Sequence, residues 1–394
     1  MVPIVLEKNL RRARAEADNC SETLSPNLTL SMRPVVRFSP ANRSAFTTTL
    51  RQRVNQYFKD NNISRYGNRE MVVKTVVLLG VYLACYLLIL TLPINPWWLL
   101  LLVIPMGISK AGIGMSVMHD ALHGSYAKKK WINQWVGRSI YLVGANPSVW
   151  KIQHNVLHHT FTNIHGLDED INSKSIIRLS EHAPQSWFHR YQHIYALFLY
   201  GGMTLMMTIN DLFKLIRYRR TGMVEKQSMR FNLECTKLVA TKVAYLFFML
   251  VLPVLVTALT WWQVLIGFVV MHLIAGYILS IIFQMAHVVE GAHQPLPATD
   301  DSMENAWAIH QLETTANFAR NSRVLNWFVG GLNFQIEHHL FPNICHVHYR
   351  KISDIVKATA EDFQLPYNMK PTFGDALRSH LRMLKTLGRT SVPA

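Results

Sequence analysis

Two long apolar stretches limit the folds open to this chain more than any other feature of its sequence. The first stretch is broken by Pro93 and Pro96, and the second by Trp261 and Trp262, so that each divides into two segments. Each segment approaches the roughly 20 apolar residues that cross a bilayer as a helix. We therefore predict an all-α integral membrane protein with four transmembrane helices in two hairpins. The predicted spans lie near 72–92, 97–117, 239–260 and 263–285.

The distribution of charge predicts how these helices are oriented. Half of the residues are hydrophobic, only 16% are charged and the formal net charge is +16, yet neither predicted turn contains a Lys or Arg. Because basic residues favour cytosolic loops, we expect both termini and the long central segment in the cytosol. No motif combines basic and aromatic residues as nucleic-acid-binding proteins do, so the charge excess is attributed to membrane topology and not to a nucleic acid partner.

Three further segments complete the predicted organisation. Residues 1–31 have scattered charges and no apolar core, which excludes a secretory signal peptide and predicts a mobile N-terminal tail. Residues 388–394 are expected to be a C-terminal tail, which leaves one membrane domain over 32–387. Residues 194–209 are apolar but short, so an interfacial or re-entrant helix is expected there.

Four widely spaced cysteines form no CxxC pair, and they support neither a disulfide scaffold nor a zinc ribbon.

Eighteen histidines are unevenly spread along the chain, and many fall in three short boxes, HDALH, HNVLHH and QIEHH. Residues four apart lie on one face of a helix and can present two imidazoles to the same point. The first box lies at the exit of the second predicted span, and a further histidine lies at the matching exit of the fourth. All can meet on one side, just beneath the bilayer surface. The candidate metal ligands are His119, His123, His154, His158, His159, His287, His338 and His339.

The size of this ligand set bears on which metal it would bind. Imidazole suits zinc, copper, iron and nickel, whereas a zinc site usually takes three or four protein ligands. Seven or eight imidazoles therefore suggest two metals, and an all-nitrogen pair in a membrane enzyme points to iron and oxygen chemistry. Structural zinc is the alternative. Because the ligands must be neutral to bind, acid is expected to strip the site.

Each ligating imidazole also needs a partner for its second ring nitrogen. Asp120, Asp168, Asp170 and Glu337 are close in sequence, although turn and cap roles explain them equally well. His272 lies within a span and is expected to be a hydrogen-bonded core residue. His165 and His310 are possible donors to the site. The histidines expected at the interface or surface are His182, His189, His193, His346 and His348.

The segments HDALHGS, WKIQHNVLHHTFTNIHGLDEDI and FQIEHHLFPNICHVHY resemble the three histidine boxes of membrane fatty-acid desaturases. Gln335 is typical of the front-end branch, which includes the linoleoyl-CoA and the acyl-lipid delta-5 and delta-6 desaturases, and bacterial stand-alone members are similar over most of the chain. The resemblance implies a cytosolic helical cap that holds a di-iron site ligated by the eight histidines. His287 is assigned by its place at the end of the fourth span.

The resemblance also implies a reaction, in which oxygen is used to insert a double bond on the carboxyl side of an existing one. The substrate would be an acyl-CoA or acyl-lipid, with its anionic headgroup on 127–130, Arg178 or 217–220. The sequence contains no HPGG haem motif, so electrons are expected from a separate cytochrome b5 or ferredoxin. An acidic donor can dock on a basic face.

Two other functions remain open on the sequence alone. A di-iron membrane hydroxylase of the same superfamily would use the same metals, and spacing does not distinguish the two. A metal-binding membrane transporter would line its spans with polar or charged residues, whereas the predicted spans show only His272 and lysines near their ends. The sequence also leaves open whether Gln335 contacts a metal, holds a water or shapes the pocket.

Overall fold

The computed structural model describes residues 36–39, 45–172 and 176–390. The predicted N-terminal tail and the last residues of the predicted C-terminal tail, 391–394, lie outside the described residues. The described residues are mostly helical, as the sequence predicts. Their strands form two short parallel pairs, β1 with β2 and β3 with β4.

The first half of the described chain contains β1 (Arg37–Phe38), α2 (Ala45–Asp60), α3 (Arg69–Thr91), α4 (Pro96–Gly112), η1 (Ile113–Val117), α5 (Met118–His123), α6 (Lys130–Gly137), α7 (Ile140–Val143), α8 (Pro147–Trp150), η2 (Lys151–His158), η3 (Trp187–Tyr191), α9 (Gln192–Tyr200) and α10 (Met203–Arg220). The second half contains α11 (Met223–Lys226), α12 (Phe231–Leu246), η4 (Phe247–Val251), α13 (Leu252–Val256), α14 (Trp261–His287), β2 (Ser302–Met303), α15 (Trp307–Thr314), β3 (Asn317–Phe318), α16 (Arg323–Phe328), α17 (Gln335–Leu340), η5 (His346–His348), α18 (Tyr349–Asp362), β4 (Met369–Lys370) and α19 (Phe373–Leu387).

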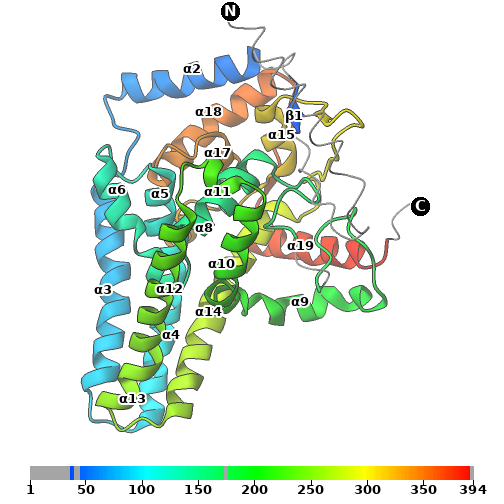
Figure 1. The fold of residues 1–394 in the computed structure, drawn as a ribbon. Helices are drawn as coiled ribbons and strands as arrows, with labels where there is room; N and C mark the ends of the chain where they lie inside the picture. The colour runs from blue at the N-terminus through cyan, green and yellow to red at the C-terminus, as the bar shows by residue number, and fades with distance from the viewer. Residues whose placement is uncertain (1–35, 40–44, 173–175, 391–394) are drawn as a thin grey trace, which may run out of the picture. The chain divides into compact units, whose positions relative to one another are not determined.

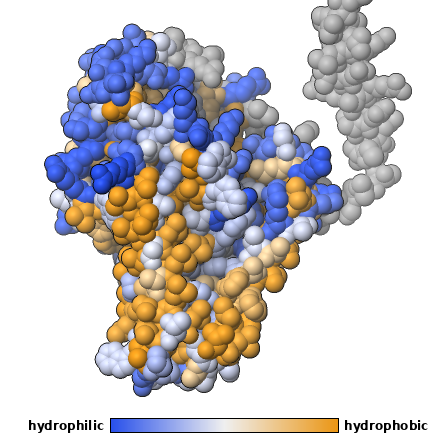
Figure 2. Space-filling view, turned by 90° about the vertical axis from the view of Figure 1, so that its left-hand side faces the viewer, coloured by the Kyte–Doolittle hydropathy of each residue, from blue (hydrophilic) through white to orange (hydrophobic). Residues whose placement is uncertain are grey.

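Four continuous helical segments are long and apolar enough to cross a membrane, namely Arg69–Thr91, Pro96–His123, Phe231–Val256 and Trp261–His287. They correspond to the four apolar segments in the sequence, and they run side by side (Figure 1). The helix that carries the third predicted span begins at Phe231, before that span, because its first two turns mix apolar residues with Asn232, Glu234, Thr236 and Lys237 and so weaken the hydrophobic signal. Hydrophobic surface covers much of this part of the molecule, and hydrophilic surface covers the part beyond the helix ends (Figure 2).

The residues over 194–209, predicted as an interfacial or re-entrant helix, lie on two helices. Trp187–Tyr200 and Met203–Arg220 meet at a bend of 84°. The bend packs closely on α14, because a Cβ atom at Gly276 would clash with the carbonyl oxygen of Gly201. Glycine at position 276 is therefore required for the bent pair to reach the fourth apolar helix.

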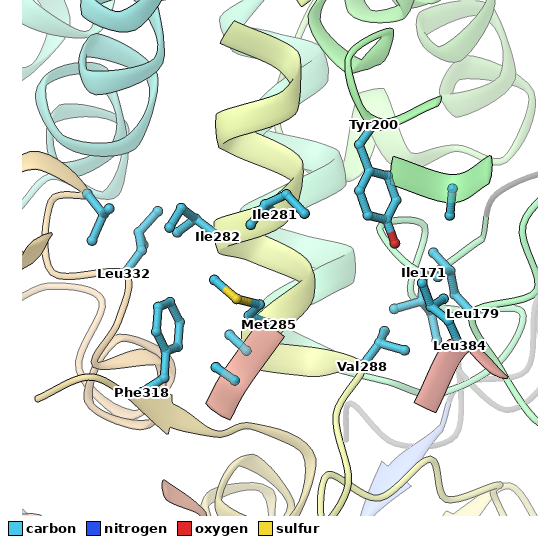
Figure 3. Packing of buried hydrophobic residues seen from close by; sticks show 14 of the residues in the cluster. Ile171, Leu179, Tyr200, Ile281, Ile282, Met285, Val288, Phe318, Leu332 and Leu384 are labelled. Carbon is cyan, nitrogen blue, oxygen red and sulfur yellow. The ribbon is translucent and has the colours of Figure 1, made fainter. Parts of the chain in front are cut away.

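The largest buried hydrophobic cluster surrounds the last turns of α14. Figure 3 shows Met285 and its neighbours on α14 between Phe318 and Leu332 on one side and Tyr200 and Leu384 on the other. This packing joins the end of one apolar helix to β3, α9 and α19. The final residue of α14, His287, is thereby held in place by segments that are far apart in the sequence.

Candidate metal centre

The eight histidines predicted as ligands lie in one cluster where α5 and α14 end. The ligand nitrogens of one group lie within 4.8 Å of one another, and this group is His119, His123, His154 and His338. A second group with the same spacing is His158, His287 and His339. His159 forms a third group with His338 and His339, so it lies between the first two. All eight side chains are buried except His123, which is partly buried.

A local departure from α-helical geometry brings the second box together. The backbone N–H of His159 bonds to the carbonyl of His154, five residues back, so η2 is a π-helical turn. Such turns are rare and occur frequently at functional sites. The α-helical spacing predicts that only His154 and His158 share a face, whereas the wider turn also brings the ring centroid of His159 to 4.8 Å from that of His154. All three histidines of one box can therefore face the same centre.

Four of the rings have Nδ1 bonded to a neighbour and Nε2 without a partner. The Nδ1 contacts are those of His154 with Asp170 (3.4 Å), His158 with Asp168 (3.0 Å), His338 with Tyr349 (3.3 Å) and His339 with Gln311 (2.9 Å). The Nε2 atom of each of these rings is buried without a hydrogen-bond partner. Because buried polar atoms are costly when unpaired, the arrangement fits metal ions that would bind these Nε2 atoms.

Asp168 both orients a ligand ring and stabilises a turn, the two roles that the sequence left open for it. Its Oδ2 atom faces Nδ1 of His158 and also accepts from the backbone N–H of Asn163 at 2.9 Å. Its Oδ1 atom accepts from the backbone N–H of Asp170 at 2.9 Å. The same carboxylate thus closes the turn and orients a ring. Asp170 in turn accepts from the side-chain amide of Gln153 and faces His154.

The other two predicted orienting groups have different neighbours. Glu337 does not face a histidine, and it accepts from Asn317 Nδ2 at 2.8 Å and from Tyr367 Oη at 2.9 Å. Burial raises the pKa of Glu337 to about 7. Asp120 Oδ2 lies 2.8 Å from His346 Nδ1, while Asp120 Oδ1 lies 3.6 Å from His119 Nδ1.

Gln335 lies beside the second histidine group. Its side-chain amide nitrogen is 2.9 Å from Nε2 of His287, and its Oε1 atom is buried without a hydrogen-bond partner. The glutamine is therefore close enough to interact with a metal ion, or with a water on it, at the group of His158, His287 and His339.

Burial sets the protonation of most of the ring nitrogens outside the apolar helices. It lowers the pKa of His154 to about 3, and together with neighbouring imidazoles it lowers the pKa of His159, His338 and His339 well below the usual range. Burial also acts to lower the pKa of His158, but Asp168 and Asp170 outweigh it and raise that pKa. Neutral imidazoles, the form that binds metals, are thus favoured at most positions.

Three histidines predicted at the surface are buried, so the prediction is wrong for His189, His346 and His348. Each finds a partner that its local sequence does not reveal. His348 Nε2 lies 3.0 Å from the carbonyl of Tyr66, and His189 Nδ1 accepts from the backbone N–H of Ser186 at 2.9 Å. His346 bonds to Asp120, as described above.

Arg178, a predicted headgroup contact, is also buried. It donates to main-chain carbonyls, among them Ala183 at 2.7 Å and Thr390 at 2.8 Å, so this prediction is wrong. Exposed basic residues do occur in the other two predicted headgroup regions, at Lys128 to Lys130 and at Arg219 and Arg220.

The remaining predicted histidines lie outside the cluster. His272 is a hydrogen-bonded core residue, as expected, but Lys110 beside it is fully buried within an apolar helix and is not near a span end. The ring centroid of His165 lies 6.5 Å from that of His182, with the two ring planes tilted by 49°. His310 Nε2 is 2.8 Å from the carbonyl of Thr162.

Three side chains that hydrogen-bond to ligand rings were not predicted from the sequence. Thr162 Oγ1 and Gln311 Oε1 lie 3.2 Å and 2.9 Å from Nδ1 of His339, and Tyr349 Oη lies 3.3 Å from Nδ1 of His338. Thr162 follows His158 by four residues and its hydroxyl donates to the carbonyl of His158 at 2.7 Å in the turn after the helix, so its spacing was an available signal. Gln311 is distant from His339 in sequence, and Tyr349 lies in a different helix from His338. No local sequence pattern predicts either contact.

The sequence is similar to that of known desaturases over the region that contains this cluster. A family model described as fatty acid desaturase matches residues 95–371, a region that contains all eight histidines. An acyl-lipid (8-3)-desaturase from Physcomitrium patens is 37% identical over 90% of this chain and 74% of its own length. Proteins named sn-1 linoleoyl-lipid 6-desaturase are similar in Arthrospira platensis, with 34% identity over 87% of this chain and 92% of the relative, and in Synechocystis, with 33% identity over 89% and 97%.

Proposed function

Because the chain belongs to the fatty acid desaturase family, we propose that its clustered histidines hold two iron ions for desaturation of an acyl chain. The enzyme is an oxidoreductase of unsaturated fatty acid biosynthesis. The observation that carries the di-iron proposal is the pair of adjacent imidazole groups in which each ring has a buried ring nitrogen without a hydrogen-bond partner, Nδ1 for His287 and Nε2 for the others. When bound, the irons would supply the oxidising power to remove hydrogens from an unactivated chain, which acid–base side chains cannot do.

The two groups suggest how the ligands divide. One iron would be held by His119, His123, His154 and His338, and the other by His158, His287 and His339. His159 lies between them, and the amide of Gln335 is a candidate for the second iron, directly or through a water. Asp168, Asp170, Gln311 and Tyr349 would hold the ligating rings in place, as partners of ligands do in other metal sites.

The stoichiometry defines what else the reaction requires. Two hydrogens from the acyl chain, two electrons and two protons together reduce one oxygen molecule to two waters. The electrons must come from a donor, for which we propose a separate cytochrome b5 or ferredoxin. Exposed Lys and Arg residues on a chain of formal net charge +16 favour an acidic partner.

We further propose that 32–387 form one membrane domain of two hairpins with a cytosolic cap. Residues 92–95 and 257–260 contain no charged side chain, and the ring centroids of Trp97 and Trp262 lie 5.9 Å apart, which supports both turns lying at one side. The basic segments lie toward the histidine end, and the positive-inside rule then favours a cytosolic centre. The bent pair over 187–220 would lie at the interface and not span the bilayer.

For the substrate we propose an acyl chain esterified to a membrane lipid, with an acyl-CoA as the alternative. Two relatives are named for a linoleoyl-lipid and for position 6, which lies on the carboxyl side of the double bonds that a linoleoyl chain already carries. The desaturase names of the relatives also favour desaturation over hydroxylation. Exposed Lys128 to Lys130 or Arg219 and Arg220 are candidate contacts for the anionic headgroup.

The test combines product analysis with metal content. A host that expresses the chain and receives linoleate should contain a lipid-bound fatty acid with a new double bond toward the carboxyl end, identified by mass spectrometry. His338→Ala should abolish the product. His380→Ala is a matched control, because His380 is equally buried and bonds to Tyr200 and to the carbonyl of Val288, outside the cluster.

Metal analysis of the purified protein separates the possible outcomes. Two irons per chain and loss of product only in His338→Ala would support the proposal. A hydroxylated fatty acid as the product would indicate that the protein catalyses the related hydroxylase reaction and not desaturation. Zinc, or no metal in the purified active protein, would refute the di-iron site.

A further inference from the structure

A row of buried polar side chains runs from the first apolar helix to the first histidine box. Lys74 on α3 has its Nζ atom 2.5 Å from Nε2 of His346, and Nδ1 of His346 is 2.8 Å from Oδ2 of Asp120. Oδ1 of the same carboxylate lies 3.6 Å from Nδ1 of His119. Lys74, His346 and Asp120 are each at most 1% exposed. The row therefore lies away from water and ends at a proposed ligand.

We propose that Lys74 and His346 are positioning residues for the metal centre, and that they act by holding the Asp120 carboxylate against His119. This inference rests on the proposed di-iron function. It adds two residues from outside the ligand set, one of which lies on an apolar helix that contributes no ligand.

The donor and acceptor chemistry determines how the row works. A lysine ammonium only donates, so Nε2 of His346 must accept from Lys74 and the ring proton must be on Nδ1. That proton is then donated to Asp120 Oδ2, which also accepts from the backbone N–H of His346 at 3.1 Å. Two donors on Oδ2 fix the carboxylate and leave Oδ1 facing His119. At 3.6 Å this is an electrostatic contact longer than a hydrogen bond. It favours the Nδ1–H tautomer of His119, which leaves Nε2 for the metal.

Charge gives Lys74 a second effect. Asp120 is a buried carboxylate, and such a group is stabilised only when it is paired and hydrogen-bonded. Lys74 supplies the opposite charge through His346, and its ammonium also lies 5.4 Å from the ring centroid of Trp327. Removing the lysine would leave the carboxylate with a neutral partner and a ring whose tautomer is no longer fixed.

The surrounding backbone keeps Lys74 in register with the site. The segment before α3 is bonded to the segments that follow the first and third boxes, through Gly67 N–H to Tyr126 O (3.0 Å) and Cys345 N–H to Arg65 O (2.9 Å). Gly67 is needed for this approach, because a Cβ atom there would lie 2.8 Å from the Tyr126 carbonyl oxygen. The start of the first apolar helix is therefore fixed to the centre.

The test compares Lys74→Met with Lys110→Met in the purified, iron-loaded full chain. Lys110 is an equally buried lysine in an apolar helix, and it bonds to Tyr245 Oη at 2.7 Å and to His272 Nε2 at 3.0 Å, not to the centre. We expect Lys74→Met to weaken iron affinity, measured by competition with a chelator, by about 10–100-fold. This is the usual effect of removing a residue that orients a metal ligand. Lys110→Met should keep the wild-type iron affinity, even where it lowers thermal stability.

Mössbauer spectroscopy of the loaded protein gives a readout that a general loss of stability would not produce. The signal of one iron, the one at the His119 group, should change in Lys74→Met while that of the other stays as in the wild type. Lys74→Gln keeps a donor for His346 Nε2 and should show a smaller change, which also covers the case that the methionine variant does not fold.

Three results would overturn the inference. Equal loss of iron affinity in the Lys74 and Lys110 variants would reduce Lys74 to a structural residue. Mössbauer spectra unchanged from the wild type in both Lys74 variants would also show that Lys74 does not position the centre. Wild-type protein that binds no iron would refute the proposed function itself, and the positioning role with it. If the wild type loads iron normally, a negative result in the variants refutes the role of Lys74 alone.

Discussion

Asn163 makes the contacts whose loss should most clearly loosen the centre. Its side-chain nitrogen lies 2.9 Å, 3.1 Å and 3.0 Å from the carbonyls of His287, His293 and Thr314. The residue is fully buried, and its φ of +59° is in the left-handed region. One side chain from the loop after the second box thus holds the end of α14, where His287 lies, and the end of α15.

The cost of Asn163→Ala follows from these contacts. The amide has two N–H groups for the three carbonyls, and at about 1 kcal/mol net for each hydrogen bond their loss costs about 2 kcal/mol. A left-handed alanine adds about 1 kcal/mol. The total of about 3 kcal/mol corresponds to a fall in Tm of about 4 °C for a chain of 394 residues, at an unfolding entropy of about 2.1 cal/mol/K per residue.

Thermal unfolding of the detergent-solubilised protein, with iron content measured in parallel, checks this estimate. Asn163→Gly tolerates the positive φ and should lose less than Asn163→Ala. Asn163→Asp is nearly isosteric but turns acceptors toward three carbonyl oxygens, so it should be at least as unstable as the alanine variant. An aspartate variant as stable as the wild type, or an alanine variant within about 1 °C of it, would refute the hydrogen-bond argument.

Three further predictions concern the centre. Asp168→Asn should weaken iron binding about 10–100-fold, measured by chelator competition, whereas the exposed Asp300→Asn should not. The metal-free protein should lose thermal stability as the pH falls below about 6.5, because burial lowers the pKa of His154 to about 3 and the unfolded chain then binds protons that the folded chain does not. Gly330→Ala should greatly reduce the yield of folded protein relative to Gly374→Ala, because its Cβ atom would clash with the Met115 carbonyl oxygen at a φ of +62°, whereas the nearest atom at Gly374 is 3.8 Å away.

The apolar helices could be predicted from sequence because their signal is local. A run of some 20 apolar residues has few alternatives to a membrane helix, and all four predicted segments fall on helices of this kind. The helix α12 begins before the predicted span, because residues 231–238 mix apolar with polar and charged side chains and the helix continues past the apolar run. Composition identifies a span well but locates the end of its helix poorly.

The ligand set was also predicted, but for an incomplete reason. Spacing of four residues identified His154 and His158, while the place of His159 depends on the π-helical turn, which no rule of α-helical periodicity contains. The His346 contact was missed for another reason. Its partners are 226 and 272 residues away in sequence, and neither a histidine in a polar loop nor a lysine near a helix start shows that both will be buried.

Buried polar residues within the apolar helices bear on the remaining alternative, a metal transporter. Such a protein would expose charged groups along a path through its spans. In the described spans, Lys110 is bonded to Tyr245 and His272, and His272 Nδ1 also lies 2.9 Å from Thr204 Oγ1. These four residues come from α4, α12, α14 and α10, so their hydrogen bonds join three apolar helices to the bent pair. Because these four residues satisfy one another, Lys110 and His272 are not left as free polar groups along a path through the described spans.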